Sequence, residues 1–126
     1  MPQVIIALGS NTLQQAHIQW ASQALSAILS DMRASRVIWT QDIKGSGQWY
    51  LNRLVAGHTK LSKEQLEQQL KALEQRAGRT KERISIDLDL MMYHDEKLHL
   101  RDWPRPYIQN LLPDINKCKI ATNCHL

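Results

Sequence analysis

The spacing of apolar side chains along the chain predicts alternating strands and helices. Residues 4–8 form an uninterrupted apolar run that ends at Gly9, which is typical of a strand buried on both faces. Further along, apolar residues recur at intervals of three, four and seven, which predicts an amphipathic helix; they are Ile18, Ala21, Leu25, Ile28 and Leu29. We expect Ser10, Asn11 or Thr12 to cap this helix by accepting its free backbone N–H groups.

Two more strands are expected before the next helix. Residues 33–40 are rich in β-branched and aromatic side chains and predict the second strand. Residues 50–58 predict the third strand, whose alternation would place Tyr50, Asn52, Leu54 and Ala56 on one face and Leu51, Arg53 and Val55 on the other. The segment 42–48 contains Gly-Ser-Gly and predicts a flexible loop between these strands, suited to closing over a ligand.

The second helix carries the clearest local signals. Ser62 and Gln65 have the spacing of a capping box, and Gly78 supplies the left-handed residue that commonly ends a helix. Its expected buried stripe consists of Leu66, Leu70, Leu73 and Ala77. Glu74 falls in the last turn, where the helix dipole disfavours an acid, so we expect either a ligand or Arg79 to compensate its charge.

Residues 84–91 alternate strictly and predict a fourth strand with two different faces. Asp87 and Asp89 share one face, where two neighbouring anions repel each other. A divalent cation would relieve this repulsion, and Mg²⁺ usually binds one or two carboxylates together with substrate phosphates. The basic run at 79–83 is well placed to hold those phosphates. On spacing alone, two acids on an ordinary solvent-exposed strand face are the more common explanation.

The order strand, helix, strand, strand, helix, strand predicts an α+β fold, a two-layer sandwich with an antiparallel sheet. Two helices would cover one face and leave the other face open for chemistry. After the fourth strand we expect a turn at 93–97, a short strand at 98–100 and a stiff extended segment at 103–107. Residues 1–115 would form a single domain and residues 116–126 a polar, mobile C-terminal tail.

The composition is that of an ordinary globular domain, with 43% hydrophobic and 22% charged residues and no Phe. A net charge of +4 suits an anionic small ligand as well as it suits nucleic acid. The apolar run at 4–8 is too short for a signal-peptide core or a membrane span, so we expect a cytoplasmic protein without membrane association. Cys118 and Cys124, beside His125, match no common zinc pattern and are expected to be reduced thiols.

Three separated stretches resemble the 6-hydroxymethyl-7,8-dihydropterin pyrophosphokinases of folate biosynthesis. They are residues 5–11 at the first turn, residues 50–52 at the start of the third strand, and residues 74–79 leading into 87–91. The resemblance covers most of the chain. It implies a ferredoxin-like two-layer sandwich, with ATP and Mg²⁺ as co-substrates. The implied reaction transfers diphosphate from ATP to the pterin hydroxymethyl group and releases AMP.

The resemblance also implies roles for individual residues on the phosphate side. Asp87 and Asp89 would hold two magnesium ions that bridge the nucleotide phosphates. The catalytic basic positions of the family would be filled by Arg79, Lys81 and Arg83. Glu74 would lie on the nucleotide side, together with the phosphate contacts of Arg79 and Lys81.

On the pterin side, the resemblance implies a pocket formed by Thr40, Tyr50 and Asn52. The amide of Asn52 can donate and accept hydrogen bonds in one plane, so it would read the edge of the pterin ring. Without the resemblance, a Tyr at the start of a strand is more often a core residue. The expected partners are small molecules, a pterin and ATP, and the expected state is a monomer or weak dimer.

The chain departs from the family pattern at several phosphate and lid positions. Only two residues separate Lys81 from Ile84, where the family has a longer loop with a Trp and a further Arg. A family His, a downstream Arg and a Phe that stacks on the pterin have no counterpart. Trp49, Trp103 and Tyr107 offer other rings. The alternative function is therefore a relative that binds a pterin or nucleotide without efficient transfer.

A third possibility is an RNA-binding module built on the same topology. Such modules place stacking aromatic side chains on their central strands. Here the strands at 4–8 and 84–91 carry no aromatic residue, and two acids stand where RNA would approach. The sequence therefore disfavours a nucleic-acid partner.

Overall fold

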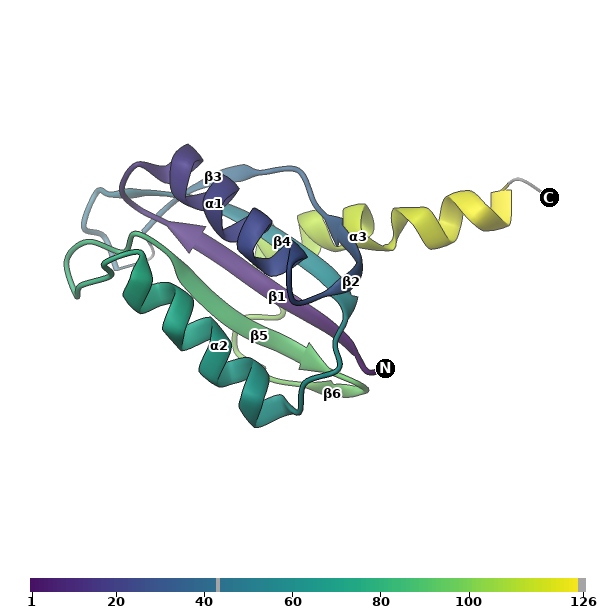
Figure 1. Cartoon of the computed structure of the whole chain (residues 1–126). Helices are drawn as coiled ribbons and strands as arrows, with labels where there is room; N and C mark the ends of the chain where they lie inside the picture. Colours follow the sequence, from purple (N-terminus) through teal and green to yellow (C-terminus); the bar gives the residue numbers. More distant parts are fainter. Residues whose placement is uncertain (43, 125–126) are drawn as a thin grey trace.

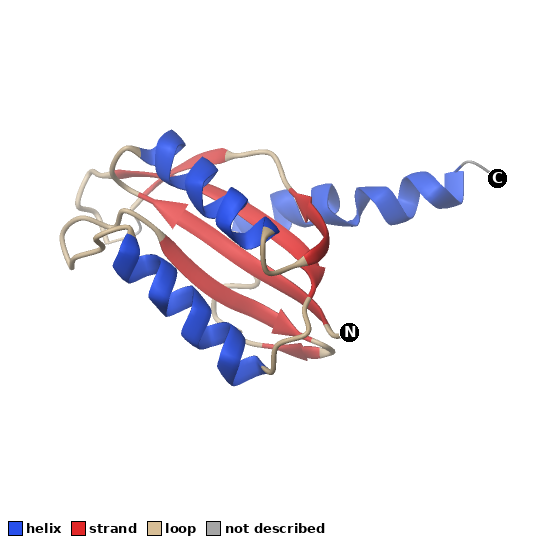
Figure 2. Ribbon diagram, viewed as in Figure 1, coloured by secondary structure: helices blue, strands red, loops and turns tan. Residues whose placement is uncertain are grey.

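A computed structural model describes residues 1–42 and 44–124, and the side chains up to residue 116 except that of residue 43 (Figure 1). Within these residues the chain forms one sheet of six strands and three helices. In chain order they are β1 (Gln3–Ser10), α1 (Gln14–Ser26), β2 (Ser30–Ala34), β3 (Ile38–Gln41), β4 (Trp49–His58), α2 (Lys63–Arg76), β5 (Asp87–Tyr93), β6 (Glu96–Lys97) and α3 (Pro106–Cys124). Figure 2 shows α1 and α2 on one face of the sheet and α3 on the other.

The sheet is antiparallel in all of its pairings, and β1 lies at its centre. The strand order is β2–β4–β1–β5–β6, and β3 pairs with β4 beside β2. Strand β1 pairs along its whole length with β4 on one side, and its residues 4–9 pair with β5 on the other. This order, with α1 and α2 as the connecting helices, is that of a ferredoxin-like α+β sandwich, so the predicted fold class is confirmed.

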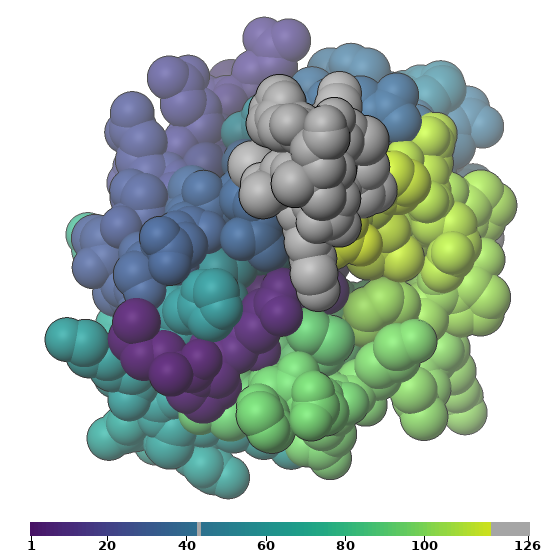
Figure 3. Space-filling model, turned by 90° about the vertical axis from the view of Figure 1, so that its right-hand side faces the viewer, coloured from purple at the N-terminus to yellow at the C-terminus, as the bar shows by residue number. Residues whose placement is uncertain are grey.

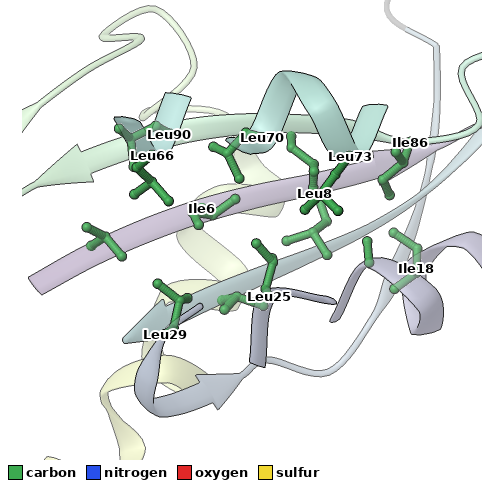
Figure 4. Close-up of a cluster of buried hydrophobic side chains, with 14 of the residues drawn as sticks. Ile6, Leu8, Ile18, Leu25, Leu29, Leu66, Leu70, Leu73, Ile86 and Leu90 are labelled. Carbon is green, nitrogen blue, oxygen red and sulfur yellow. The ribbon is translucent and has the colours of Figure 1, made fainter. Parts of the chain in front are cut away.

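The first core layer lies between the sheet and helices α1 and α2 (Figure 4). Ile6 and Leu8 of β1 point toward the helices because alternate side chains on a strand share a face. The two helices contribute the apolar stripes that their sequences predict, with Ile18, Ala21, Leu25, Leu66, Leu70 and Leu73 all buried.

Helix α2 begins and ends as its sequence predicts. The Ser62 Oγ accepts from the Gln65 N–H at 3.2 Å, and the Gln65 Oε1 accepts from the Ser62 N–H at 2.9 Å. Gly78 follows the helix with a φ of +77°, a conformation that is strained for other residues.

The second face of the sheet is not open, contrary to the sequence prediction. Helix α3 packs against it in a second core layer that also buries Trp103. The layer joins β1, β4 and β5 to α3 through Ile5, Ala7, Leu54, Ala56, Met91, Ile108, Leu111 and Ile115. The free part of this face is therefore confined to one end of the sheet.

One prediction for the C-terminal part is wrong. Residues 103–107 are not an extended segment, because they contain a turn and the first residues of α3. Pro106 begins the helix, a position where its fixed φ and missing N–H are tolerated. The backbone from residue 116 continues this helix to Cys124. The side chains of Cys118 and Cys124, and all of His125, lie outside the described residues.

The predicted second strand, residues 33–40, is divided into β2 and β3. At the break, the Ser35 Oγ accepts from the Leu54 N–H at 2.8 Å in place of a regular ladder partner. Arg36 then turns toward α3, where its Nε lies 3.1 Å from the Asp114 Oδ2. Side-chain partners at these two positions interrupt a run of residues that favours a strand.

Three local boundaries also differ from the predictions. Strand β5 begins at Asp87 and not at residue 84, because Ile84 pairs with the β1–α1 turn. The short strand after it is β6 at 96–97, reached through a tight turn at His94, and not residues 98–100. Helix α1 follows Leu13, and within the described residues no side chain caps it, so the expected cap is wrong.

Backbone hydrogen bonds hold the N-terminal end of β1 to the segments beside it. The His94 N–H donates to the Gln3 carbonyl at 2.8 Å, and the Thr59 N–H donates to the Pro2 carbonyl at 3.0 Å. Figure 3 shows this end of the molecule, with the first residues in purple beside the green segment that contains β6. Among the described helices, none is long and apolar enough to cross a membrane.

Candidate active site

A cavity of about 1040 Å³ lies where β1 ends and where β4 and β5 begin. Its walls come from the β1–α1 turn, β3 and the β3–β4 loop, the α2–β5 loop, and the turn before α3. Most of the predicted site residues line it: Thr40, Tyr50, Asn52, Arg79, Lys81, Asp87 and Asp89. Glu74 and Arg83 are not among the lining residues.

Asp87 and Asp89 project from β5 into this cavity, as the alternation predicts. Gly9 of β1 lies opposite Asp87 and Ala7 lies opposite Asp89, so β1 places no large side chain beside either carboxylate. Burial raises the pKa of Asp89 to about 7, and the neighbouring charge of Asp87 adds to this shift. The two acids therefore destabilise each other when both are charged.

The donor set of this acidic pair fits Mg²⁺. Carboxylate oxygens are hard ligands, and a bound dication would remove the repulsion between Asp87 and Asp89. Within the described part of the chain, no group of three or more His, Cys, Asp or Glu side chains could hold a metal ion. The remaining ligands would be water and phosphate oxygens, which is the usual way in which proteins bind Mg²⁺ beside a nucleotide.

Arg79 links this pair to helix α2. Its Nη1 lies 3.3 Å from the Glu74 Oε1, and its Nη2 lies 3.3 Å from the Asp87 Oδ1. The other carboxylate oxygen of Glu74 accepts from the Leu88 N–H at 2.8 Å. Burial raises the pKa of Glu74, and the hydrogen bond from Leu88 and the charge of Arg79 partly oppose this shift. Arg79 is therefore the partner that compensates Glu74 in the last helical turn.

The other basic residues of the α2–β5 loop differ in position. Lys81 lines the cavity, whereas Arg83 is exposed and lies outside its wall. The backbone of Arg83 closes a tight turn, since its N–H donates to the Thr80 Oγ1 at 3.0 Å and its carbonyl accepts from the Thr80 N–H at 2.9 Å. Lys81 is therefore placed to meet a ligand in the cavity, whereas Arg83 is not among the residues that line it.

Asn52, Thr40 and Tyr50 lie together on the strand side of the cavity. Asn52 is buried, and its Nδ2 donates to the Thr40 Oγ1 at 2.8 Å and to the Ile38 carbonyl at 3.2 Å. These bonds fix the orientation of the amide. A Cβ at Gly9 would lie 3.5 Å from the Asn52 Oδ1 and 3.8 Å from the Tyr50 ring, so the glycine leaves both groups uncovered on that side.

Three further residues line the cavity that were not predicted as site residues, Asn11, Asp102 and Arg105. Asn11, expected to cap a helix, instead joins the β1–α1 turn to the α2–β5 loop, because its N–H donates to the Ile84 carbonyl at 2.9 Å. Asp102 and Arg105 line the cavity from the turn before α3, a segment that was expected to be extended. In the sequence, the feature that could have pointed to these two residues is their charge beside Pro104 and Pro106, where a helix begins.

The three aromatic rings considered for stacking are separated by the fold. Tyr107 lines the cavity, and burial raises the pKa of its hydroxyl. Trp103 is buried in the second core layer, and Trp49 is about half exposed. Of these three rings, Tyr107 is therefore the one available to a ligand in the cavity.

The fold and the site define a class of protein: a ferredoxin-like sandwich whose cavity places a carboxylate pair beside basic side chains. The sequence matches the family model for 7,8-dihydro-6-hydroxymethylpterin-pyrophosphokinase (HPPK) over residues 5–116. The chain therefore belongs to the HPPK family, and the resemblance seen in the sequence is confirmed. A comparison with curated proteins gives no match. Family membership supports a pyrophosphokinase role in folate biosynthesis.

Proposed function

We propose that the chain is a 2-amino-4-hydroxy-6-hydroxymethyldihydropteridine diphosphokinase. It would transfer diphosphate from ATP to 6-hydroxymethyl-7,8-dihydropterin and release AMP. One observation supports this beyond family membership: a single cavity is lined both by the acidic pair, Asp87 and Asp89, and by the Asn52–Thr40–Tyr50 group. The candidate ligands of a metal ion that would hold phosphates, and the polar groups suited to a planar ring, thus line the same cavity. We expect the activity in the cytoplasm, carried by a monomer or weak dimer.

In this reaction the pterin hydroxymethyl oxygen attacks the β-phosphorus of ATP, and the bond between that phosphorus and the α–β bridging oxygen breaks. The hydroxyl proton passes to solvent, and AMP leaves. Mg²⁺, when bound by Asp87 and Asp89, supplies the positive charge that offsets the charge of the phosphates. Arg79 and Lys81 stabilise the phosphate oxygens through charged hydrogen bonds.

The strand side of the cavity would hold the pterin. Because Asn52 donates to Thr40 and Ile38, its carbonyl oxygen is left to accept from a ligand N–H. The ring of Tyr50 provides a flat surface against which a planar ligand packs. Asn52 therefore determines which edge of the pterin ring is accepted, and Tyr50 determines the plane in which the ring lies.

A second candidate function is binding of the same ligands without efficient transfer. Two observations favour it: Arg83 lies outside the cavity wall, and Arg79 is already engaged by Glu74 and Asp87. Phosphoryl-type transfer depends on positioned positive charge, and the loss of one cation can reduce the rate by about a thousandfold.

The test is AMP formation from ATP, 6-hydroxymethyl-7,8-dihydropterin and Mg²⁺. We expect the native chain to form AMP and Asp87→Ala and Asp89→Ala to reduce the rate by about a thousandfold or more. Asp95→Ala is the matched control, because Asp95 is an exposed acid outside the cavity wall. Binding of ATP or pterin without AMP formation would favour the second candidate, and absence of both would refute the two proposals.

A further inference from the structure

We propose that β3 is a self-association surface, at which two copies of the chain pair antiparallel about a twofold axis at Trp39. This surface is an edge of the sheet, and its use does not depend on the proposed function. Strand β3 pairs with β4 on one side, and within the described part of the chain no strand pairs with its other side. The outer backbone groups of β3 are therefore available to a further strand.

The hydrogen bonds between β3 and β4 show which backbone groups face outward. The pairing continues one residue beyond β3, where the Asp42 N–H donates to the Gln48 carbonyl at 2.8 Å. In an antiparallel pair, alternate residues of a strand bond to the same neighbouring strand. Thr40 therefore also bonds to β4, whereas Trp39 and Gln41 direct their N–H and carbonyl groups to the open edge.

The edge lacks the features that usually keep a strand from pairing with another chain. Residues 37–41 contain neither a charged residue nor a proline. Val37 is 41% exposed, Trp39 is 47% exposed and Trp49 is 49% exposed. Trp39 lies opposite Leu51 of β4, two residues after Trp49, so the two indole rings are diagonal neighbours on one face. Large apolar side chains are therefore presented to solvent beside an open strand.

The packing of the helices explains this exposure. Helix α1 packs mainly on β1, β2 and β4, and helix α3 packs mainly on β2 and β4. Neither helix has its main contacts with β3. This packing leaves Trp39 without a helix over it, and a strand can approach the outer side of β3 without displacing a helix from its main contacts.

A second copy of the same strand fits this edge. With the twofold axis at Trp39, its N–H and carbonyl bond to the carbonyl and N–H of Trp39 of the partner subunit. Val37 then lies opposite Gln41 of the partner subunit, and the axis repeats this pair. The outward backbone groups of Trp39 and Gln41 thus obtain partners, and the two exposed indole rings meet on the same face of the joined sheet.

The charges at the two ends of β3 favour this register and a second copy as the partner. Just beyond the paired residues, Arg36 would face Asp42 of the partner subunit, and the axis repeats this pairing of opposite charges. The Arg36 side chain is 59% exposed although it already contacts a carboxylate of α3, and Asp42 is only partly buried. An axis at Thr40 would instead place Arg36 opposite Lys44, where like charges repel. The charge pattern therefore supports pairing about Trp39.

The size of β3 limits both the strength and the extent of the association. The strand has four residues, so the interface is smaller than that of a stable dimer, and we expect weak association. A twofold axis uses the open side of β3 in both copies. No equivalent edge remains on either copy, so association should stop at the dimer.

The test is sedimentation velocity of the full chain at about 1 to 500 µM, a range that covers weak association. We expect monomer at the low end, dimer at the high end, and monomer throughout for Trp39→Lys, because two positive charges would meet at the axis. Leu100→Lys is the matched control, since Leu100 is 69% exposed and lies outside β3, and it should dimerise like the native chain. A native chain that stays monomeric or grows beyond the dimer would overturn the proposal, and so would native dimerisation of Trp39→Lys.

Oxidative cross-linking tests the register and keeps Trp39 in place. In a background of Cys118→Ser and Cys124→Ser, the double variant Val37→Cys with Gln41→Cys would place thiols opposite each other, so we expect a disulfide-linked dimer. Either substitution alone would leave the equivalent thiols of the two copies roughly 13 Å apart along the strands, too far for a disulfide. Failure of the double variant to cross-link, or equal cross-linking of a single variant, would overturn the axis at Trp39.

Discussion

Asn11 and Ile84 exchange two hydrogen bonds across the open end of β1. The Asn11 N–H donates to the Ile84 carbonyl at 2.9 Å, and the Asn11 Oδ1 accepts from the Ile84 N–H at 2.8 Å. The side-chain amide of Asn11 also donates to the Gln48 Oε1 at 2.9 Å and contacts the Tyr50 hydroxyl at 3.4 Å. One residue therefore connects the α2–β5 loop, which carries Arg79 and Lys81, with the strand side of the cavity.

We expect Asn11→Ala to lower AMP formation more than it lowers stability. The Ile84 N–H would lose its acceptor, at a cost of about 1 kcal/mol in the free energy of unfolding, because this site is only partly buried. The loop that carries Lys81 would at the same time lose its attachment to the strand side. Urea unfolding and kcat/KM for ATP measure the two effects. Gln15→Ala, at an exposed position in the first turn of α1, serves as control; a loss of stability with native kcat/KM would contradict this prediction.

Glu74→Ala and Glu74→Gln should differ in their effects on stability. The Ala variant leaves the partly buried Leu88 N–H without its acceptor, so we expect unfolding to be easier by about 1–3 kcal/mol. The Gln variant keeps an oxygen for Leu88 and loses the charge that faces Arg79, so the loss should be smaller. Denaturant unfolding measures both, with Glu67→Ala as an exposed control on the same helix. Equal losses of unfolding free energy in the two variants would show that the hydrogen bond from Leu88 is not the main contribution of Glu74 to stability.

The stability of the metal-free chain should fall as the pH rises from 3.8 to about 7. The folded chain holds a proton on Asp89 over a range in which the unfolded chain has released it, so folding binds protons there and a higher pH favours unfolding. The raised pKa of Glu74 acts in the same direction.

Asp89→Asn should flatten this pH dependence and raise the free energy of unfolding at pH 8 by about 1 kcal/mol or more. Urea unfolding at several pH values, with the exposed Asp95→Asn as control, measures it. The affinity for Mg²⁺ should increase as the pH rises through about 7, because a proton on Asp89 competes with the metal. A native pH slope in Asp89→Asn would assign the effect to other groups.

Leu111→Ala should destabilise the chain by about 2–5 kcal/mol, because Leu111 is fully buried between α3 and the second face of the sheet. Thermal or denaturant unfolding measures this loss. Asn116→Ala, at an exposed position of the same helix, should lie within about 0.5 kcal/mol of the native chain. If both variants unfolded like the native chain, α3 would not be docked as described.

Local sequence patterns predicted the structure correctly where an element depends mainly on its own residues. Alternation alone placed Asp87 and Asp89 on one strand face, and the capping box with Gly78 gave both ends of α2. The face of β4 that carries Asn52 followed from the same period-two rule.

Where tertiary contacts decide, the same patterns failed. The prolines before α3 suggested an extended segment, but Pro106 starts a helix whose apolar residues Ile108, Leu111 and Ile115 fall on one side. That helix covers a face that was expected to be open and brings Arg105 into the cavity wall. Asn11 has the residue type of a helix cap, yet its partner is Ile84, which no local rule could identify.

The central place of β1 has a consequence for synthesis of the chain. Residues 4–8 leave the ribosome first among the strands, but their partners in β4 and β5 are residues 53–57 and 88–93, which are made much later. Until then this apolar segment has no partner strand on either side, and such a segment is prone to aggregate. We therefore expect chaperones to bind nascent chains that stop before residue 93, and long-range pairing to make refolding slower than in helical proteins of this length.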